Sequence, residues 1–225
     1  MKKNGFTLAE VLITLAIIGV VATMTLPALM NNTGEQQYIT GLKKGINTLT
    51  EAAQLSKAID NVDFSNIVTD DEGTALPSAT LDPASPTLYA LINSRISVDP
   101  LKSTQNRTGS KGAGGGANNY AIFFRDGAAL YYPKTQAATD VKDLKTDGLV
   151  GGIRAVYDVN GMKGPNVLSN CSGNVAGVQD AYTEGVAENP CNDITKRVIG
   201  DQFAIRLRGN IAVPNGNAAR WAFEK

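Results

Sequence analysis

One carboxylate stands where the sequence is otherwise apolar. Glu10 lies near the start of a run from Phe6 to Met30 in which nearly every residue is apolar or small. A carboxylate in a membrane helix costs about 2.5 to 3.5 kcal/mol at the centre and less near an end, and it usually has a partner. The next basic residue is Lys43, which lies far beyond reach along one helix at about 1.5 Å per residue. We therefore expect Glu10 to pair with another chain or with a newly made N-terminal amine.

Two further groups of residues later in the chain have side chains that suit binding or bond formation. Asp158, Asn160 and Asp201 supply oxygen atoms, and calcium takes six to eight oxygen ligands. The stretch around Asn160 is also typical of an ordinary type I′ hairpin turn, so both interpretations stay open. Cys171 and Cys191 are the two cysteines. We predict a disulfide between them if this part of the chain leaves the cytoplasm, and two thiols if it does not.

Composition excludes several classes of function. The chain has no histidine, which removes Ser-His-Asp and Cys-His catalysis and every His-ligated zinc site. It has 21 basic and 21 acidic residues, so no overall positive charge favours nucleic acid. The Gly-rich stretch 103–119 lacks the Gly-Lys-Ser/Thr pattern of a phosphate-binding loop. We expect no enzymatic activity, no nucleic-acid partner and no cofactor other than calcium.

The apolar run has the length of a membrane-spanning helix. Val11 to Met30 is twenty residues without a charge, and about 20 such residues cross a bilayer. Lys2 and Lys3 precede it, and a positive flank stays cytoplasmic, which places the body of the chain outside. A secretory signal would have a shorter apolar core and a cleavage site beyond it. A plain uncleaved anchor explains the run, but explains neither Glu10 nor the leader-like residues 1–5.

The segment "KKNGFTLAEVLITLAIIGVVATMTLPAL" resembles the N-terminal signal of type IV pilins and type II secretion pseudopilins. The resemblance rests on the basic leader, Gly5 before the cut, Phe6 as the new first residue and Glu10 as the fifth residue of the mature chain. It implies that a prepilin peptidase cuts after Gly5 and methylates the amine of Phe6. It also implies that Glu10 pairs with that amine on a neighbouring subunit. Pro27 falls where these helices commonly carry a kinking proline.

The resemblance also implies where the protein works. We expect a single-pass protein of the bacterial inner membrane, with a cytoplasmic N-terminus and its head outside, that is built into a homo-oligomeric filament. Its partners would be other pilin or pseudopilin subunits, the prepilin peptidase, the inner-membrane assembly platform and the lipid bilayer. The alternative function is that of a minor tip pilin whose head binds a surface, a secreted protein or DNA.

The residues after the anchor predict an α+β fold like that of pilins. A stripe of apolar residues recurs every three or four positions and forms one helical face: Ile39, Leu42, Ile46, Leu49 and Ala53. The expected product is one long helix from about Phe6 to Ala58, whose second half packs on a small antiparallel sheet. Gly41 and Gly45 have the spacing of a small-residue packing face, or fall there by chance.

The expected organisation is a leader at 1–5, a transmembrane half-helix at 6–30, an amphipathic half-helix at 31–60 and an extracytoplasmic head at 61–225.

Strands of the head are indicated by alternating apolar residues and by turn residues. We predict a hairpin around Arg125–Gly127, a strand at Ile153–Asp158, and another strand ending at Gly209–Asn210. Alternation after Gly200 predicts that this last strand buries one face only. A short helix is expected with Ser85 as its cap and Pro86 as its first residue.

The stretch "DVNGMKGPN" before a Gly-Asp-x-Phe strand resembles a segment of pseudopilin-like proteins. Some secretion pseudopilins bind calcium in this part of the head. The resemblance therefore adds to the calcium interpretation of Asp158, Asn160 and Asp201.

Overall fold

The computed structural model of the chain describes residues 7–67, 78–105, 119–133, 152–171 and 190–225, and only the backbone of residues 26–32. The chain divides into two compact units, Met1–Gln37 and Tyr38–Lys225. Each unit is described by itself.

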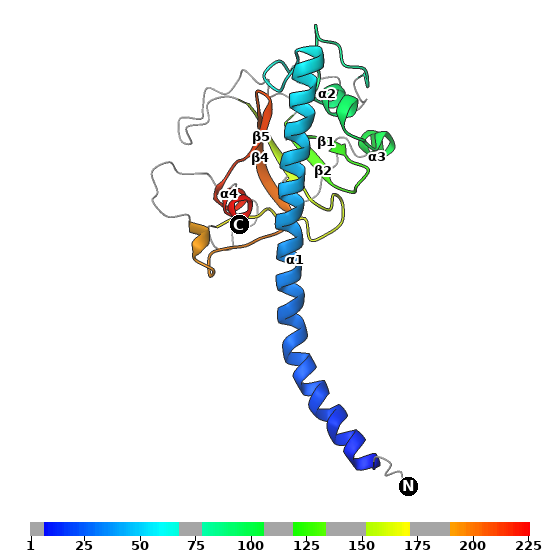
Figure 1. Cartoon of the computed structure of the whole chain (residues 1–225), viewed down its shortest axis with the longest axis vertical. Helices are drawn as coiled ribbons and strands as arrows, with labels where there is room; N and C mark the ends of the chain where they lie inside the picture. Colours follow the sequence, from blue (N-terminus) through cyan, green and yellow to red (C-terminus); the bar gives the residue numbers. More distant parts are fainter. Residues whose placement is uncertain (1–6, 68–77, 106–118, 134–151, 172–189) are drawn as a thin grey trace. The chain divides into compact units, whose positions relative to one another are not determined.

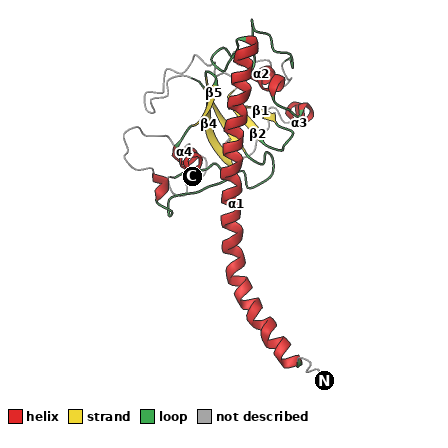
Figure 2. Cartoon of the chain, viewed as in Figure 1, coloured by secondary structure: helices red, strands yellow, loops and turns green. Residues whose placement is uncertain are grey.

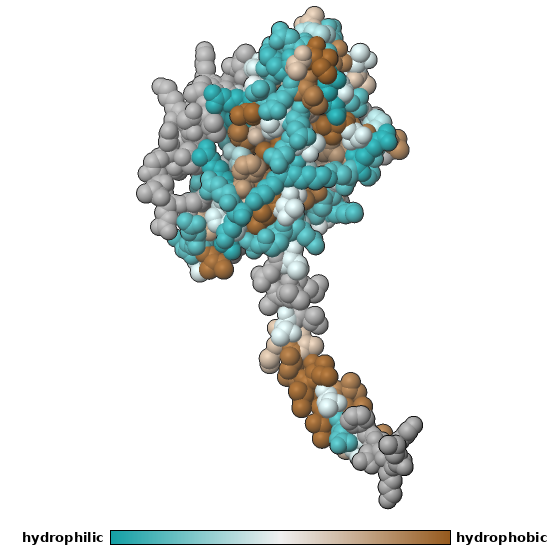
Figure 3. All heavy atoms as spheres, viewed as in Figure 1, coloured by the Kyte–Doolittle hydropathy of each residue, from teal (hydrophilic) through white to brown (hydrophobic). Residues whose placement is uncertain are grey.

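Helix α1, Leu8–Asp60, runs through both units and has 53 residues. Its bounds confirm the predicted long helix to within two residues at each end. The first part contains an apolar window, Leu8–Thr25, that is long and apolar enough to cross a membrane. None of this window is buried against the rest of the chain, and Figure 3 shows its apolar side chains at the surface. The helix continues through Pro27; the predicted kink there stays a prediction.

A five-stranded antiparallel sheet forms the centre of the second unit (Figures 1 and 2). The strands follow one another in the order of the sequence, β1-β2-β3-β4-β5. Their bounds are β1 Asn119–Phe123, β2 Ala129–Pro133, β3 Ile153–Asp158, β4 Gln202–Arg208 and β5 Ile211–Pro214. The predicted hairpin around Asp126 joins β1 to β2, and its carboxylate accepts a hydrogen bond from the Ala128 N–H at 3.2 Å. The fold is α+β with a pilin-like arrangement, as the sequence predicts.

One face of the sheet packs on the second part of α1. All five residues of the predicted apolar stripe are at most 3% exposed, and they share one core with the apolar residues of all five strands. The described residues of this unit also form three short α-helices, α2 Leu88–Arg95, α3 Pro100–Gln105 and α4 Asn217–Glu224, and one turn of 3-10 helix, Pro190–Asn192. Helix α4 has buried alanines and Trp221 in the same core as α1. No pattern that we used predicted α3 or α4.

Two glycines allow α1 to lie close to the sheet. A side chain at Gly41 would collide with Val159, and a side chain at Gly45 would collide with the ring of Tyr157. The small-residue spacing of Gly41 and Gly45 therefore serves contact between helix and sheet inside one chain. This contact explains why α1 tolerates two residues that each weaken a helix by up to about 1 kcal/mol relative to alanine.

Two local predictions were wrong. Strand β4 buries both faces: Ala204 is 9% exposed and Arg206 is fully buried. The second face carries its own apolar cluster, to which Leu168 and Met162 belong, so the loop after β3 helps to cover it. The first residue of α2 is Leu88, and its cap is Thr87, whose hydroxyl accepts a hydrogen bond from the Ala90 N–H at 3.1 Å. The threonine supplies a cap two residues beyond the predicted Ser85.

Candidate processing and assembly site

Glu10 and Thr7 form a reciprocal pair at the start of α1. The Glu10 Oε2 atom accepts hydrogen bonds from the Thr7 N–H at 2.8 Å and from the Thr7 hydroxyl at 2.7 Å. In return, the Glu10 N–H donates to the Thr7 hydroxyl at 3.3 Å. This is a capping box, in which a threonine and a glutamate three residues later satisfy each other's free N–H groups. The Thr7 carbonyl accepts the first helical bond, from the Val11 N–H at 3.3 Å.

The capping box explains how an apolar helix accommodates the carboxylate. A helix N-terminus carries unpaired N–H groups and a partial positive charge, and both stabilise an anion. The Thr7 N–H belongs to the peptide bond with Phe6, so it remains after a cut behind Gly5. The pair is therefore compatible with both the precursor and the mature chain. Our expectation that Glu10 has no partner along its own chain missed Thr7, because we considered only basic side chains.

One oxygen of Glu10 remains for an external partner. Both hydrogen bonds that the Glu10 carboxylate accepts end on Oε2, and among the described residues none reaches Oε1. The side chains around it, Leu8, Val11 and Leu12, are 79%, 46% and 58% exposed. The site therefore combines a fixed carboxylate with uncovered apolar surface. Gly5 and Phe6, the predicted processing residues, lie outside the described residues.

The two cysteines are joined as predicted. Cys171 and Cys191 form a disulfide with their Cα atoms 5.0 Å apart, and 20 positions separate them in sequence. Both are almost fully buried, at 2% and 0% exposure, and belong to the main core. Residues 172–189 between them lie outside the described part. A buried bond of this kind fits a protein whose head matures in an oxidising compartment.

The predicted calcium residues meet where β3 ends and β4 begins. Asp158 and Asp201 are both fully buried. The Asp158 carboxylate accepts hydrogen bonds from the Asn160 N–H at 3.1 Å and from the Gln202 amide at 2.8 Å. Asp201 accepts from the backbone N–H groups of residues 166 and 167, each at 2.8 Å. The two carboxylates therefore fix the loop that follows β3.

Burial dominates the electrostatics of this cluster. It raises the pKa of Asp158 to about 7, and the nearby charge of Asp201 raises it further, while hydrogen bonds from Gln202 and the loop backbone oppose the shift. Burial also raises the pKa of Tyr131, with smaller contributions from the two carboxylates. The turn at Asn160 is not the expected type I′ hairpin: Asn160 lacks the positive φ that this turn requires. It is an Asx turn, held by the Asp158 carboxylate.

The residues of this cluster meet some requirements of a calcium site. The side-chain oxygens of Asn160 and Asn166 are buried and have no hydrogen-bond partner among the described residues. Such oxygens suit a hard cation. Each carboxylate oxygen of Asp158 and Asp201 already accepts one internal hydrogen bond, and a carboxylate oxygen has a second lone pair to offer. Among the described residues, no three Asp, Glu, Cys or His side chains lie close enough together to hold a metal ion.

Comparison with known proteins identifies the N-terminal segment alone. Residues 1–26 match the family model of the prokaryotic N-terminal methylation motif, the signature of type IV pilins and pseudopilins. The motif implies assembly with other pilin subunits and processing by a prepilin peptidase. No curated protein and no solved structure matches the chain significantly.

Sequence reasoning found Glu10 but missed its cap. The signal was visible, since Thr-Leu-Ala-Glu is the spacing of a capping box before an apolar run. It was overlooked because only basic groups were considered as partners of the carboxylate.

Proposed function

We propose that this protein is a structural subunit of a type IV pilus or a type II secretion pseudopilus. It is cleaved after Gly5, methylated at the amine of Phe6 and assembled into a helical filament. The observation that carries the proposal is the methylation motif at residues 1–26. Two features of the fold support it: the uncovered apolar window of α1 and the pilin-like α+β arrangement.

Assembly uses the apolar surface of α1. In the membrane, the side chains of Leu8–Thr25 face lipid, and in the filament they face the same segment of neighbouring subunits. Because these side chains are in apolar surroundings both before and after assembly, association of the helices depends on packing and on polar pairs between them. Glu10 supplies the polar pair: its Oε1 atom accepts the methylated ammonium of Phe6 from the next subunit, while Thr7 holds Oε2. An ion pair in this apolar setting fixes the register between subunits.

The proposed topology follows the charge of the leader and the disulfide. The N-terminus stays cytoplasmic, residues 6–30 span the inner membrane, and the amphipathic half-helix 31–60 and the head 61–225 lie outside. The disulfide between Cys171 and Cys191 supports an oxidising compartment for the head. The prepilin peptidase and the inner-membrane assembly platform meet the chain on its membrane segment.

The test is a pair of substitutions at one position. Glu10→Gln keeps the shape of the side chain and its hydrogen bonds to Thr7, but removes the charge that attracts an ammonium. We expect membrane insertion and cleavage to be unchanged and the filament yield after shearing to fall strongly. Glu10→Asp keeps the charge but shortens the side chain, and we expect an intermediate yield. Wild-type yields from Glu10→Gln would refute the pairing, and a minor share of this subunit in purified filaments would favour the tip-pilin function.

We also propose calcium binding as a second property, on the strength of the buried, unpartnered oxygens of Asn160 and Asn166. The ligands would include Asp158, Asn160 and Asp201, and the ion would stiffen the loop between β3 and β4. Calorimetric titration of the EDTA-treated protein tests the proposal. Heat of binding together with a higher melting temperature supports it, and the absence of both refutes it. Magnesium is the control cation, because its smaller octahedral shell suits such a site poorly.

A further inference from the structure

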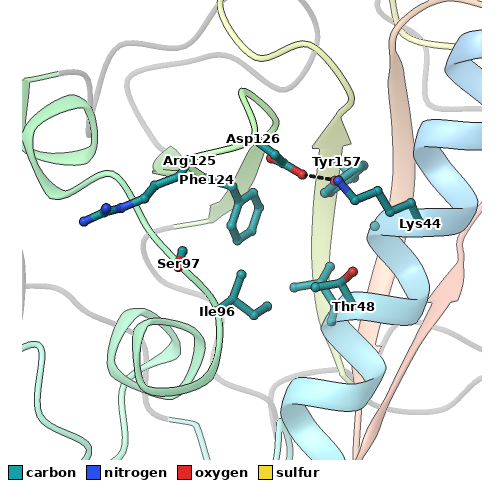
Figure 4. Close-up of a pocket in the computed structure, with 10 residues that line it drawn as sticks. Lys44, Thr48, Ile96, Ser97, Phe124, Arg125, Asp126 and Tyr157 are labelled. Carbon is teal, nitrogen blue, oxygen red and sulfur yellow. Dashed lines mark hydrogen bonds and ion pairs between the residues drawn. The ribbon is translucent and has the colours of Figure 1, made fainter.

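A cavity of about 450 Å³ lies in the second unit beside α1. Figure 4 shows its side chains: Thr48 comes from α1, Tyr157 from β3, and Ile96 and Phe124 from the opposite wall. Most of this lining is apolar. At the rim, the Lys44 ammonium and the Asp126 carboxylate form an ion pair at 2.8 Å, with side chains 64% and 42% exposed. A cavity of this size, apolar inside with a few polar groups at its rim, is typical of a binding site.

A second feature of the head is an exposed turn with an apolar tip. Residues 192–196 directly follow the buried Cys191 and are all exposed, and the side chain of Ile194 is 71% exposed. The Asp193 carboxylate holds this turn, accepting hydrogen bonds from the Thr195 N–H at 3.0 Å and hydroxyl at 2.7 Å. Lys196 pairs with Asp193 at 3.3 Å. The disulfide and the Asp193 bonds give the turn a fixed shape, which we call the Ile194 turn.

The cavity and the Ile194 turn are complementary in charge and polarity. The cavity presents an apolar centre beside the Lys44–Asp126 ion pair, and the Arg125 guanidinium at its edge extends away from that pair (Figure 4). The turn presents Ile194 beside the Asp193–Lys196 ion pair. If the Ile194 side chain enters the cavity of another molecule, Asp193 can meet Lys44, and Lys196 can meet Asp126. The two partners then exchange their internal ion pairs for intermolecular ones, and no charge is left unpaired.

We propose that the Ile194 turn of one subunit docks into the cavity beside α1 of a second copy of this chain. The inference rests on the proposed function, because it names a contact between heads in the filament. In the view of Figure 1, the short orange helix Pro190–Asn192, which leads into the Ile194 turn, and the strands β1 and β2 lie on opposite sides of α1. The contact therefore joins two different surfaces. A contact of this kind repeats from molecule to molecule, and it yields a helical filament when the rotation does not close into a ring.

The first test removes the apolar tip in the full-length protein. Ile194→Ser should lower the yield of sheared filaments by about tenfold and leave the melting temperature of the protein unchanged. Leu101→Ser is the matched control, since Leu101 is 66% exposed on α3 and takes no part in the contact. Equal filament yields from Ile194→Ser and wild type would overturn the inference.

The second test changes charges but keeps the Asp126 and Asp193 carboxylates that hold the hairpin and the turn. Lys44→Glu places a carboxylate against Asp193 of the next molecule, and Lys196→Glu places one against Asp126. Each should lower the filament yield and leave the melting temperature unchanged, because like charges then meet at the contact. Lys102→Glu on α3 is the matched control, since Lys102 is also an exposed lysine paired with an aspartate three residues away. Wild-type filament yields from both Lys44→Glu and Lys196→Glu would overturn the docking.

The outcomes separate this inference from the proposed function. A wild-type chain that forms no filaments in cells with an active peptidase and assembly platform refutes the proposed function. Filaments from wild type that are insensitive to all of these substitutions refute the docking alone.

Discussion

Replacing Gly45 by alanine tests whether α1 is pressed against the sheet as closely as the structure indicates. The new Cβ atom would overlap ring carbons of Tyr157, and that residue is only 4% exposed. The ring borders the cavity beside α1, but it also packs in the main core, so turning into the cavity would cost it those contacts. Forcing a methyl group into a packed core costs about 1 to 3 kcal/mol, and the better helix propensity of alanine returns about 1 kcal/mol. We take the upper half of the range for the packing cost, because the collision is with a ring held in a strand. The free energy of unfolding should then fall by about 1 to 2 kcal/mol in total.

The assay is thermal unfolding of the full-length protein in detergent, followed by circular dichroism. For a protein of this size, each kcal/mol changes the melting temperature by about 2 to 4 °C, so Gly45→Ala should melt about 2 to 8 °C lower. The control is Gly34→Ala on the same helix, where nothing lies within 4 Å of the new atom, and we expect no loss of stability. In a Tyr157→Ala background, Gly45→Ala should cost far less than alone. A Gly45→Ala protein as stable as the wild type would refute this account of the packing.

Three further predictions concern the assembly site, the disulfide and the buried acidic cluster. Thr7→Val removes the hydroxyl that donates to Glu10 and keeps the N–H that donates to it, so we expect a filament yield between those of wild type and Glu10→Gln. A yield equal to wild type would show that the hydroxyl takes no part in assembly. The denatured, non-reduced protein should contain no free thiol, and replacing Cys171 and Cys191 by serine should cost about 3 kcal/mol, measured by urea unfolding; an unchanged midpoint would contradict this. In EDTA, stability should fall as the pH rises from about 4 to about 7, because Asp158, with its pKa raised to about 7, binds a proton in the folded chain over that range and not in the unfolded chain. Asp158→Asn should flatten this dependence, and an unchanged slope would show that other groups cause it.

Much of the fold could be predicted because its signals are local. Strand β3 has the predicted bounds, since a run of β-branched and aromatic residues ends at Asp158. The core face of α1 follows from the period of its apolar residues, and every member of the predicted stripe is buried. The β1–β2 hairpin follows from Asp126 and Gly127, which favour a turn between two apolar runs.

The errors arise where the outcome depends on contacts between distant segments. Arg206 occupies a position that alternation assigns to solvent, yet it is fully buried and donates to the Asn215 side chain at 3.1 Å. Helix α4 is short and rich in alanine, and its place depends on Trp221, over which the Arg197 guanidinium lies at 4.1 Å. The role of Gly41 depends on Val159, more than a hundred positions away. Contacts of this kind, between residues far apart in the chain, cannot be predicted by inspection of one sequence.

In the candidate sites, too, local features could be predicted and features built from distant segments could not. The processing and assembly motif could be recognised, because Glu10 and the residues around it form a contiguous segment that matches a family model over residues 1–26. The cap supplied by Thr7 was readable from the same residues and was missed. The cavity beside α1 was not readable, since its walls come from α1, the segment after α2, the hairpin and β3.

The mass of the mature N-terminus tests the central claim most directly. Protein purified from membranes of cells with an active prepilin peptidase can be digested and its N-terminal peptide measured by mass spectrometry. We predict a chain that begins at Phe6 and carries one methyl group on its amine. A chain that still begins at Met1 in those cells would contradict the proposal that this protein is a processed filament subunit.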